Sequence, residues 1–175
     1  MSKVSEVLQS INRWSIRTRF LFVTVACFGL LGAGLTIGVL LNLHPCPFCI
    51  FQRVLYLLIG FSALVGAVWA HSRPVSYSVV LTGVAAALAG LATASYQTYM
   101  QLFPASVIEC GFSEPTLIER FVDVLGTYWE FMFLATGLCS SVDWTFLGLS
   151  MANWSIPAFT VFGILMVWAM RGERR

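Results

Sequence analysis

The chain has 175 residues, of which 58% are hydrophobic and 10% are charged, and its mean hydropathy is +0.83. In soluble globular domains about a quarter of the residues are charged. This composition therefore excludes an ordinary soluble domain and indicates a protein whose main solvent is the lipid bilayer. The net charge of +2 divides into local excesses of opposite sign, which argues for membrane topology and against nucleic-acid binding.

Four apolar stretches come close to the roughly 20 residues that cross the hydrocarbon core as a helix. They run from about 20 to 43, 50 to 70, 75 to 96 and 154 to 170. The first is too long for a signal-peptide core and lacks an Ala-x-Ala cleavage site, so we expect it to remain as an anchor. The sequence therefore predicts an all-α membrane protein, a four-transmembrane-helix bundle in which residues 1–175 form a single membrane domain.

The positively charged residues predict the orientation of these helices, because Lys and Arg next to membrane helices are retained on the cytoplasmic side. They lie before the first stretch, in the turn between the second and third, and after the fourth: Lys3, Arg13, Arg17, Arg19, Arg73, Arg171, Arg174 and Arg175. Both termini are therefore expected in the cytoplasm. Two loops, at about 44–49 and 97–153, are expected on the opposite face, together with most of the acidic residues.

Cys46 and Cys49 form a Cys-x-x-Cys pair at the start of the second apolar stretch. Such a spacing is typical of a redox or metal site, and no alternating strand pattern of a soluble thioredoxin-like domain flanks it. Cys110 and Cys139 are expected on the same non-cytoplasmic face, where disulfides persist. Bonding within the first pair is the simplest assignment, and the second disulfide would join Cys110 with Cys139.

Two other interpretations of these four cysteines stay open. The disulfides can be purely structural links that fix the loops, an interpretation that applies above all to Cys110 and Cys139. Four thiolates can also bind zinc in a tetrahedral site, but a second Cys-x-x-Cys is missing, so the chain carries only half of a zinc signature. The fifth cysteine, Cys27, lies in the middle of an apolar run and is expected to pack as a small hydrophobic residue.

The segment between Cys110 and Cys139 contains an amphipathic pattern. Apolar residues recur at helical spacing, with charged and polar residues between them: Leu117, Phe121, Leu125, Tyr128 and Met132. We expect a short helix in the second external loop that lies in the membrane interface, or alternatively packs on the bundle. Either position keeps Cys110 and Cys139 near the membrane surface.

Arg53 follows Cys49 by four residues and therefore lies on the same helix face. A guanidinium inside a membrane helix is costly and usually marks a function. It can favour the Cys49 thiolate, hydrogen-bond a carbonyl oxygen of a ligand, or extend to the nearby interface. The chain has no haem-attachment or dinucleotide motif, so a lipid-soluble two-electron carrier, a quinone, is the expected electron acceptor.

Three short motifs accompany the external cysteines: Pro45-Cys46-x-x-Cys49 followed by Arg53, Gln101-Leu102-Phe103-Pro104 ending six residues before Cys110, and Trp144-Thr145-Phe146-Leu147-Gly148-Leu149 after Cys139. Their order resembles the disulfide bond formation protein B (DsbB) family across nearly the whole chain. The resemblance implies a multi-pass protein of the bacterial inner membrane that uses ubiquinone or menaquinone. It also implies a periplasmic partner, a thioredoxin-like thiol oxidase of the DsbA type.

The same resemblance implies a relay of electrons. The reduced partner would attack Cys110, and the released Cys139 would then engage Cys46. Cys49, freed as a thiolate beside Arg53, would pass the electron pair to quinone and restore the disulfide between Cys46 and Cys49. Membrane lipid is the surrounding medium, and no metal is expected.

The chain departs from some family members at Gln97, where those members carry a histidine. Gln97 can hydrogen-bond a quinone oxygen but cannot supply a positive charge, so we include it only as a weak candidate for cofactor binding. Two other functions stay open, a membrane scaffold or binding protein with structural disulfides and a thiol relay that runs in the reducing direction. Redox potentials, which the sequence does not contain, set that direction.

Overall fold

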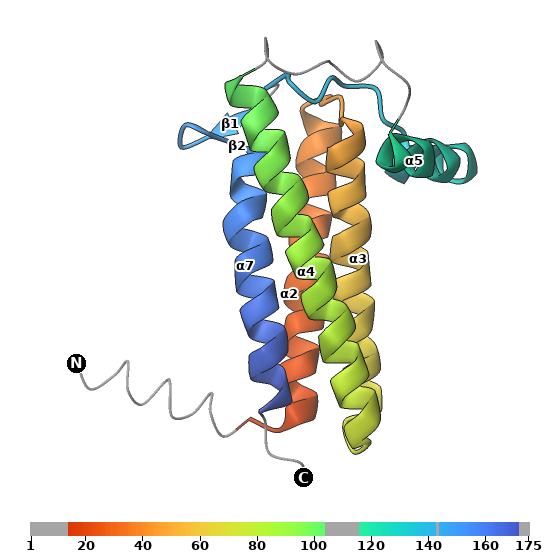
Figure 1. Cartoon of the computed structure of the whole chain (residues 1–175), viewed down its shortest axis with the longest axis vertical. Coiled ribbons are helices and arrows are strands. Elements are labelled where there is room, and N and C mark those ends of the chain that lie inside the picture. The colour runs from red at the N-terminus through yellow and green to blue at the C-terminus, as the bar shows by residue number, and fades with distance from the viewer. Residues whose placement is uncertain (1–13, 104–115, 143, 172–175) are drawn as a thin grey trace, which may run out of the picture.

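The computed structural model describes residues 14–103, 116–142 and 144–171. Four long helices run side by side along the long axis of the molecule (Figure 1): α2 (Ile16–Leu40), α3 (Pro47–Val68), α4 (Arg73–Leu102) and α7 (Met151–Met170). Each of them is long and apolar enough to cross a membrane. The predicted all-α, four-helix membrane bundle is therefore confirmed.

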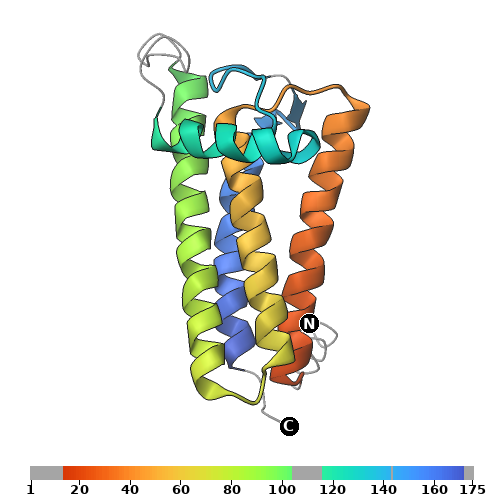
Figure 2. The same ribbon diagram turned by 90° about the vertical axis from the view of Figure 1, so that its right-hand side faces the viewer.

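Neighbouring helices along the chain also pack against each other in space. α2 packs on α3, α3 on α4 and α4 on α7, whereas the seam between α2 and α7 is much less closely packed. The described ends of the chain lie at the same end of the bundle as the turn between α3 and α4, as Figures 1 and 2 show. The turn between α2 and α3 and the start of α7 lie at the other end.

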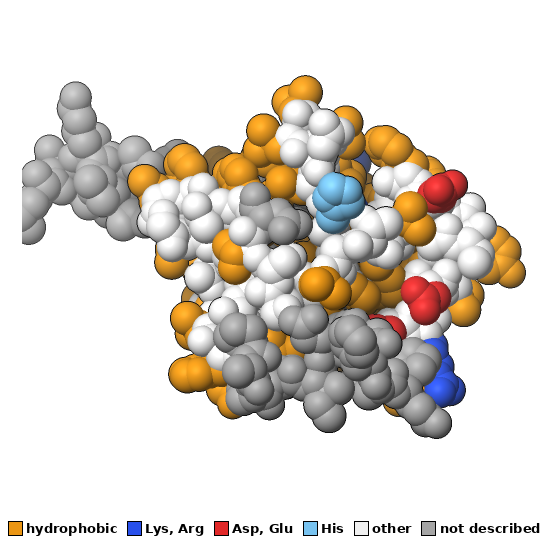
Figure 3. Space-filling model, turned by 90° about the horizontal axis from the view of Figure 1, so that it is seen from above, with side chains coloured by type: hydrophobic (Ala, Val, Ile, Leu, Met, Phe, Trp, Pro, Cys, Tyr) orange, Lys and Arg blue, Asp and Glu red, His pale blue; other side chains and the backbone are white. Residues whose placement is uncertain are grey.

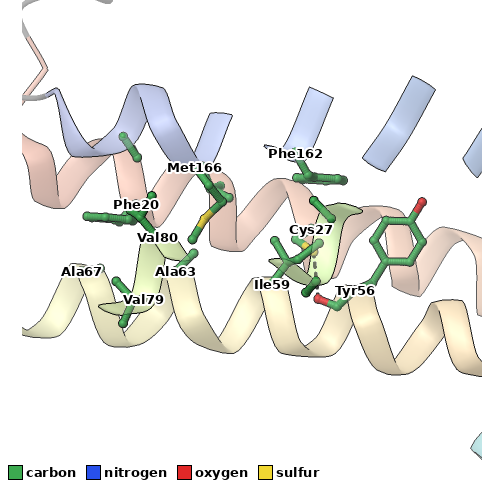
Figure 4. Packing of buried hydrophobic residues seen from close by; sticks show 14 of the residues in the cluster. Phe20, Cys27, Tyr56, Ile59, Ala63, Ala67, Val79, Val80, Phe162 and Met166 are labelled. Carbon is green, nitrogen blue, oxygen red and sulfur yellow. Dashed lines mark hydrogen bonds between the residues drawn. The ribbon is translucent and has the colours of Figure 1, made fainter. Parts of the chain in front are cut away.

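The centre of the bundle is filled by apolar side chains from all four long helices (Figure 4). Tyr56 of α3 stacks on Phe159 of α7, with ring centroids 4.2 Å apart and an interplanar angle of 8°. Cys27 is fully buried in this core, and its thiol donates to the carbonyl oxygen of Tyr56 at 3.0 Å. Cys27 thus has the packing role of a small hydrophobic residue.

Arg19 fastens the end of the bundle where the chain begins. Its guanidinium is buried and donates to the carbonyl oxygens of Trp14 and Trp168, at 3.2 and 3.1 Å. It also lies 4.5 Å from the centroid of the Trp168 ring. Because Trp168 belongs to the last turn of α7, where helix carbonyls carry partial negative charge, the position suits a cation.

α4 continues to Leu102, several residues past the end near residue 96 expected from the sequence. Its last turns are polar but paired. The hydroxyl of Thr98 donates to Asn153 of α7 at 2.7 Å, and Gln101 accepts from the hydroxyl of Ser150 at 2.7 Å. Because these polar groups find partners within the protein, the helix extends beyond its apolar run and carries Gln97 into the bundle.

α5 (Leu117–Tyr128) lies against the side of α3 near one end of the bundle, roughly perpendicular to the long helices (Figure 2), and is followed by α6 (Glu130–Phe133). A capping box between Thr116 and Glu119 starts α5. Val122 is fully buried in a cluster with Ile50 of α3, while Tyr128 is exposed. The expected amphipathic helix therefore packs one face on the bundle and presents apolar side chains on another.

Charged side chains at this end of the molecule gather over α5, while hydrophobic side chains lie at several other places along the edge of the described part (Figure 3). A short hairpin of β1 (Thr145–Phe146) and β2 (Leu149–Ser150) precedes α7. Leu147 and Gly148 at its tip have φ angles of 53° and 77°, the left-handed pair that a tight two-residue hairpin turn requires. The sequence reading did not include this hairpin.

Gly90→Ala is expected to destabilise the contact between α4 and α7. A Cβ at this position would overlap the ring of Phe159, which is fully buried and stacked on Tyr56 and so cannot move aside. Overpacking of this kind costs about 1–3 kcal/mol. The midpoint of thermal unfolding in detergent should fall accordingly.

Gly83→Ala is the graded comparison, because the added Cβ would meet the flexible end of Met166, and its effect should be smaller. Gly29→Ala is the control, since nothing lies within 4 Å of a Cβ built there. Equal losses in all three variants would contradict the packing described here.

Candidate functional site

Two of the cysteines form the N-terminus of α3. Cys46 is the N-cap residue and Pro47 takes the first helical position, which places Cys49 one turn inside. The Cys46 Sγ lies 3.2 Å from the Cys49 Sγ and accepts from the Cys49 backbone N–H at 3.4 Å. Thiolates are favoured at helix N-termini, because the unpaired backbone N–H groups and the helix dipole stabilise negative charge there.

Cys139 is brought to this pair by the segment that follows α6. The backbone N–H groups of Thr136 and Gly137 both donate to the carbonyl oxygen of Pro45, at 3.0 and 3.1 Å. Gly137 also lies close to His44, the residue before Pro45. A Cβ on Gly137 would overlap the carbonyl oxygen of His44. Cys139 and Cys46 are then only 3% and 2% exposed, in one buried cluster.

Cys46 contacts sulfur on both sides. It hydrogen-bonds with Cys49 and with Cys139. The bond with Cys139 is the main reason that the pKa of the Cys46 thiol is raised to about 12, with burial adding to the shift and the bond with Cys49 opposing it. In the reduced cluster, Cys46 is therefore a neutral thiol at neutral pH.

Two buried amide side chains complete the surroundings of the sulfurs. Gln97 of α4 donates from its Nε2 to the Cys49 Sγ at 3.0 Å and to the Cys46 Sγ at 3.3 Å. Its Oε1 accepts from the Nε2 of Gln52 of α3 at 2.9 Å. The helix extension of α4 is what makes this contact with the sulfurs possible.

A cavity of about 650 Å³ opens along the loosely packed seam between α2 and α7. Its walls are mostly apolar, and Phe146 of the β1–β2 hairpin is part of them. Cys46, Cys49, Gln97 and Arg53 are among the polar residues that line the cavity. The cavity thus combines a wide apolar space, of the size that a small-molecule site has, with a few convergent polar groups.

Arg53 is half-buried in the wall of this cavity, and its Nη1 donates to the carbonyl oxygen of Met132 in α6 at 3.0 Å. The guanidinium therefore ties α3 to α6 and also faces the space beside Cys49. A guanidinium is always charged and has five N–H donors, so one bond to Met132 leaves donors for other groups.

The chain matches the family model described as Disulfide bond formation protein DsbB over residues 16–169, which span all four long helices and the loops between them. It belongs to the DsbB family. This membership makes the protein a disulfide oxidoreductase of disulfide bond formation and, with its four membrane-spanning helices, a multi-pass membrane protein.

Curated relatives, all described as Disulfide bond formation protein B, are similar along most of their length. A DsbB-family protein of Dechloromonas aromatica is 49% identical over 144 residues, covering 82% of this chain and 86% of that protein. One of Azoarcus sp. is 40% identical over 162 residues, covering 90% and 94%. One of Aromatoleum aromaticum is 39% identical over 162 residues, covering 91% and 96%.

Most of the residues that the sequence singled out for a DsbB-family site lie together: Cys46, Cys49, Arg53, Gln97 and Cys139. Cys110 lies outside the described residues, so its pairing with Cys139 stays a prediction. Within the described ranges, no group of histidine, cysteine and acidic side chains has the arrangement of a metal site.

Gln52 is the residue that the sequence reading missed. It directly precedes Arg53 in an apolar helix, and a polar side chain in such a position already signals a partner or a function. Its contact with Gln97 joins two helices and could not be read from either one alone. Ser150 and the hairpin were likewise missed as parts of the cavity wall.

Gly137→Ala is expected to separate Cys139 from Cys46. The added Cβ would meet a backbone carbonyl, so the segment would have to leave Pro45 and lose two hydrogen bonds of about 1 kcal/mol each. In a chain with Cys49→Ser and Cys110→Ser, oxidative cross-linking of Cys46 with Cys139 should slow by about tenfold or more.

Thr136→Ala is the matched control, because the neighbouring exposed side chain is removed while the backbone N–H is kept. Its cross-linking rate should equal that of the parent chain. An unchanged rate in the Gly137→Ala variant would contradict the described attachment to Pro45.

Proposed function

We propose that the protein reoxidises a periplasmic, thioredoxin-like thiol oxidase of the DsbA type by disulfide exchange and passes the electrons to membrane quinone. The observation that carries this proposal is the position of Cys46. It hydrogen-bonds with Cys49 on one side and with Cys139 on the other, beside an apolar cavity. A structural link would need only one fixed partner, whereas an exchange step needs a sulfur within reach of two.

The exchange proceeds through thiolate attack, in which each step breaks one S–S bond and forms another. A thiolate of the reduced partner opens the disulfide between Cys110 and Cys139 and forms a mixed disulfide at Cys110. The partner's second thiolate then resolves this bond, so the oxidised partner leaves. The released Cys139 attacks Cys46 and frees Cys49, and the contact of Cys139 with Cys46 supports this step. The Cys110 thiolate then attacks Cys139, which restores the disulfide between Cys110 and Cys139 and leaves Cys46 and Cys49 reduced, so that this pair carries the two electrons destined for quinone.

The cavity supports a quinone, ubiquinone or menaquinone, as the electron acceptor. Its apolar walls suit a flat ring with an isoprenoid tail, and the open seam between α2 and α7 suits entry from the lipid. A bound quinone supplies a two-electron, two-proton acceptor. Arg53 stabilises negative charge on Cys49 and offers donors towards the cavity, while a contact of Gln97 with quinone stays a prediction.

The distribution of charge supports an inner-membrane orientation with both termini in the cytoplasm. Arg17, Arg73 and Arg171 all lie at the end of the bundle opposite the cysteines, close to the ends of α2, α4 and α7. Basic residues beside membrane helices are retained in the cytoplasm. The sulfurs would then face the periplasm, where disulfides persist.

Turnover tests this function directly. The purified protein, supplied with a soluble ubiquinone, should oxidise a reduced DsbA-type partner. Cys49→Ser and Cys110→Ser should each lower the rate to background, because each removes a sulfur that the relay needs. Loss of the quinone absorbance and alkylation of the partner's thiols measure the two half-reactions.

Cys27→Ala serves as the control, because Cys27 is a core residue away from the site, and its turnover should match the parent chain. Activity that persists in both serine variants would refute the relay. Thiol trapping in cells then separates the alternatives: structural disulfides stay oxidised when quinone is depleted, whereas those of the relay become reduced.

Gly34→Leu tests the cavity. Gly34 lines the cavity from α2, with no atom within 4 Å of a Cβ built on it, so a leucine side chain would fill part of the space. The KM for ubiquinone should rise several-fold while the exchange between Cys139 and Cys46 stays unchanged. Gly29→Leu on the same helix does not line the cavity and should leave this KM unchanged.

A further inference from the structure

Gln52 and Gln97 are buried deep in the bundle, with exposed fractions of 4% and 2%. Burying an amide is costly unless its donors and acceptor are paired. Both hydrogen-bonding sides of the Gln97 amide are used: the nitrogen donates to the two sulfurs, and the oxygen accepts from Gln52. The pair therefore has a defined direction of donation, from Gln52 to Gln97 and from Gln97 to sulfur.

Gln52 decides which way the Gln97 amide faces. With its own Nε2 turned to Gln97, Gln52 can only donate there, so it holds the Oε1 of Gln97 as its partner and leaves the Gln97 nitrogen facing Cys46 and Cys49. If the amide were reversed, its oxygen would lie against the sulfurs. An acceptor in that position would repel a thiolate instead of stabilising it.

We propose that Gln97 stabilises the reduced form of the Cys46/Cys49 pair and that Gln52 is the residue that positions Gln97 for this task. An N–H donor binds an anionic thiolate more strongly than a neutral disulfide sulfur. Because Cys46 is the neutral thiol of the reduced pair, this gain falls on Cys49, whose Sγ is also the nearer of the two to the Gln97 Nε2. Gln97 therefore favours the reduced pair over the disulfide and raises the reduction potential of this pair. A pair with a stabilised reduced form is a stronger oxidant.

This role rests on the proposed function, in which the pair must draw electrons from Cys139. It gives Gln97 a task that precedes any contact with quinone. Arg53 acts on the same pair with a fixed charge from the cavity wall, whereas Gln97 acts through direct contact with both sulfurs.

The reduction potential of the pair tests the proposal without quinone turnover. Full-length protein in detergent, carrying Cys110→Ala and Cys139→Ala, is equilibrated with dithiothreitol redox buffers, alkylated and analysed by mass spectrometry. Gln97→Leu should shift the equilibrium towards the disulfide by about tenfold, the effect of a hydrogen bond to a charged group. For this two-electron couple that shift is about 30 mV more negative.

Gln52→Leu should shift the equilibrium in the same direction, and the double variant should shift it no further than Gln97→Leu alone, because Gln52 acts through Gln97. Thr98→Val is the matched control. It removes a hydrogen bond between α4 and α7 at the next position, away from the sulfurs, and should leave the potential unchanged.

The two proposals fail in different ways. If the Cys46/Cys49 pair forms no disulfide in any buffer in the chain that carries only Cys110→Ala and Cys139→Ala, the proposed function is wrong. If the disulfide forms but Gln97→Leu leaves its potential unchanged or raises it, the role of Gln97 is wrong and the relay stands. Should Gln97→Leu fail to fold, an unchanged potential in Gln52→Leu overturns the proposal equally.

Discussion

The carbonyl oxygen of Pro45 is the acceptor on which the site depends. It takes hydrogen bonds from Thr136 and Gly137, and thereby joins the turn before α3 to the segment after α6. These two segments are far apart in the sequence, so the chain between them can adopt many conformations, and bringing its ends together has an entropic cost. Because Cys46 directly follows Pro45, a segment bonded to Pro45 necessarily lies beside that sulfur, and the packing of α5 on α3 supports the same arrangement.

Some pairs of the four long helices pack closely, whereas the contact between α2 and α7 is open. Small residues let α4 and α7 approach closely, since Gly90 accommodates the ring of Phe159. The seam between α2 and α7 is instead occupied by the cavity. The tightly packed seams hold α3 and α4 in a fixed register, which lets Gln52 meet Gln97, while the open seam leaves a path to the lipid.

Much of the fold could be predicted from the sequence, because apolar runs of membrane length have few other solutions. The end of α4 could not, since its last turns are polar and their partners, Asn153 and Ser150, come from distant parts of the chain. The hairpin strands are too short to show alternation. At the site, the cysteines and Arg53 could be predicted from their residue type and spacing. Gln52 and Gly137 matter through contacts that form only in the folded chain.

The pairing of two neutral amides also bears on how the site responds to acid. Amides do not titrate, and a guanidinium stays protonated, so Gln52, Gln97 and Arg53 keep the same charge at any acidity in which a cell lives. The hydrogen-bond donors around Cys46 and Cys49 therefore form a background whose charge does not change with acidity.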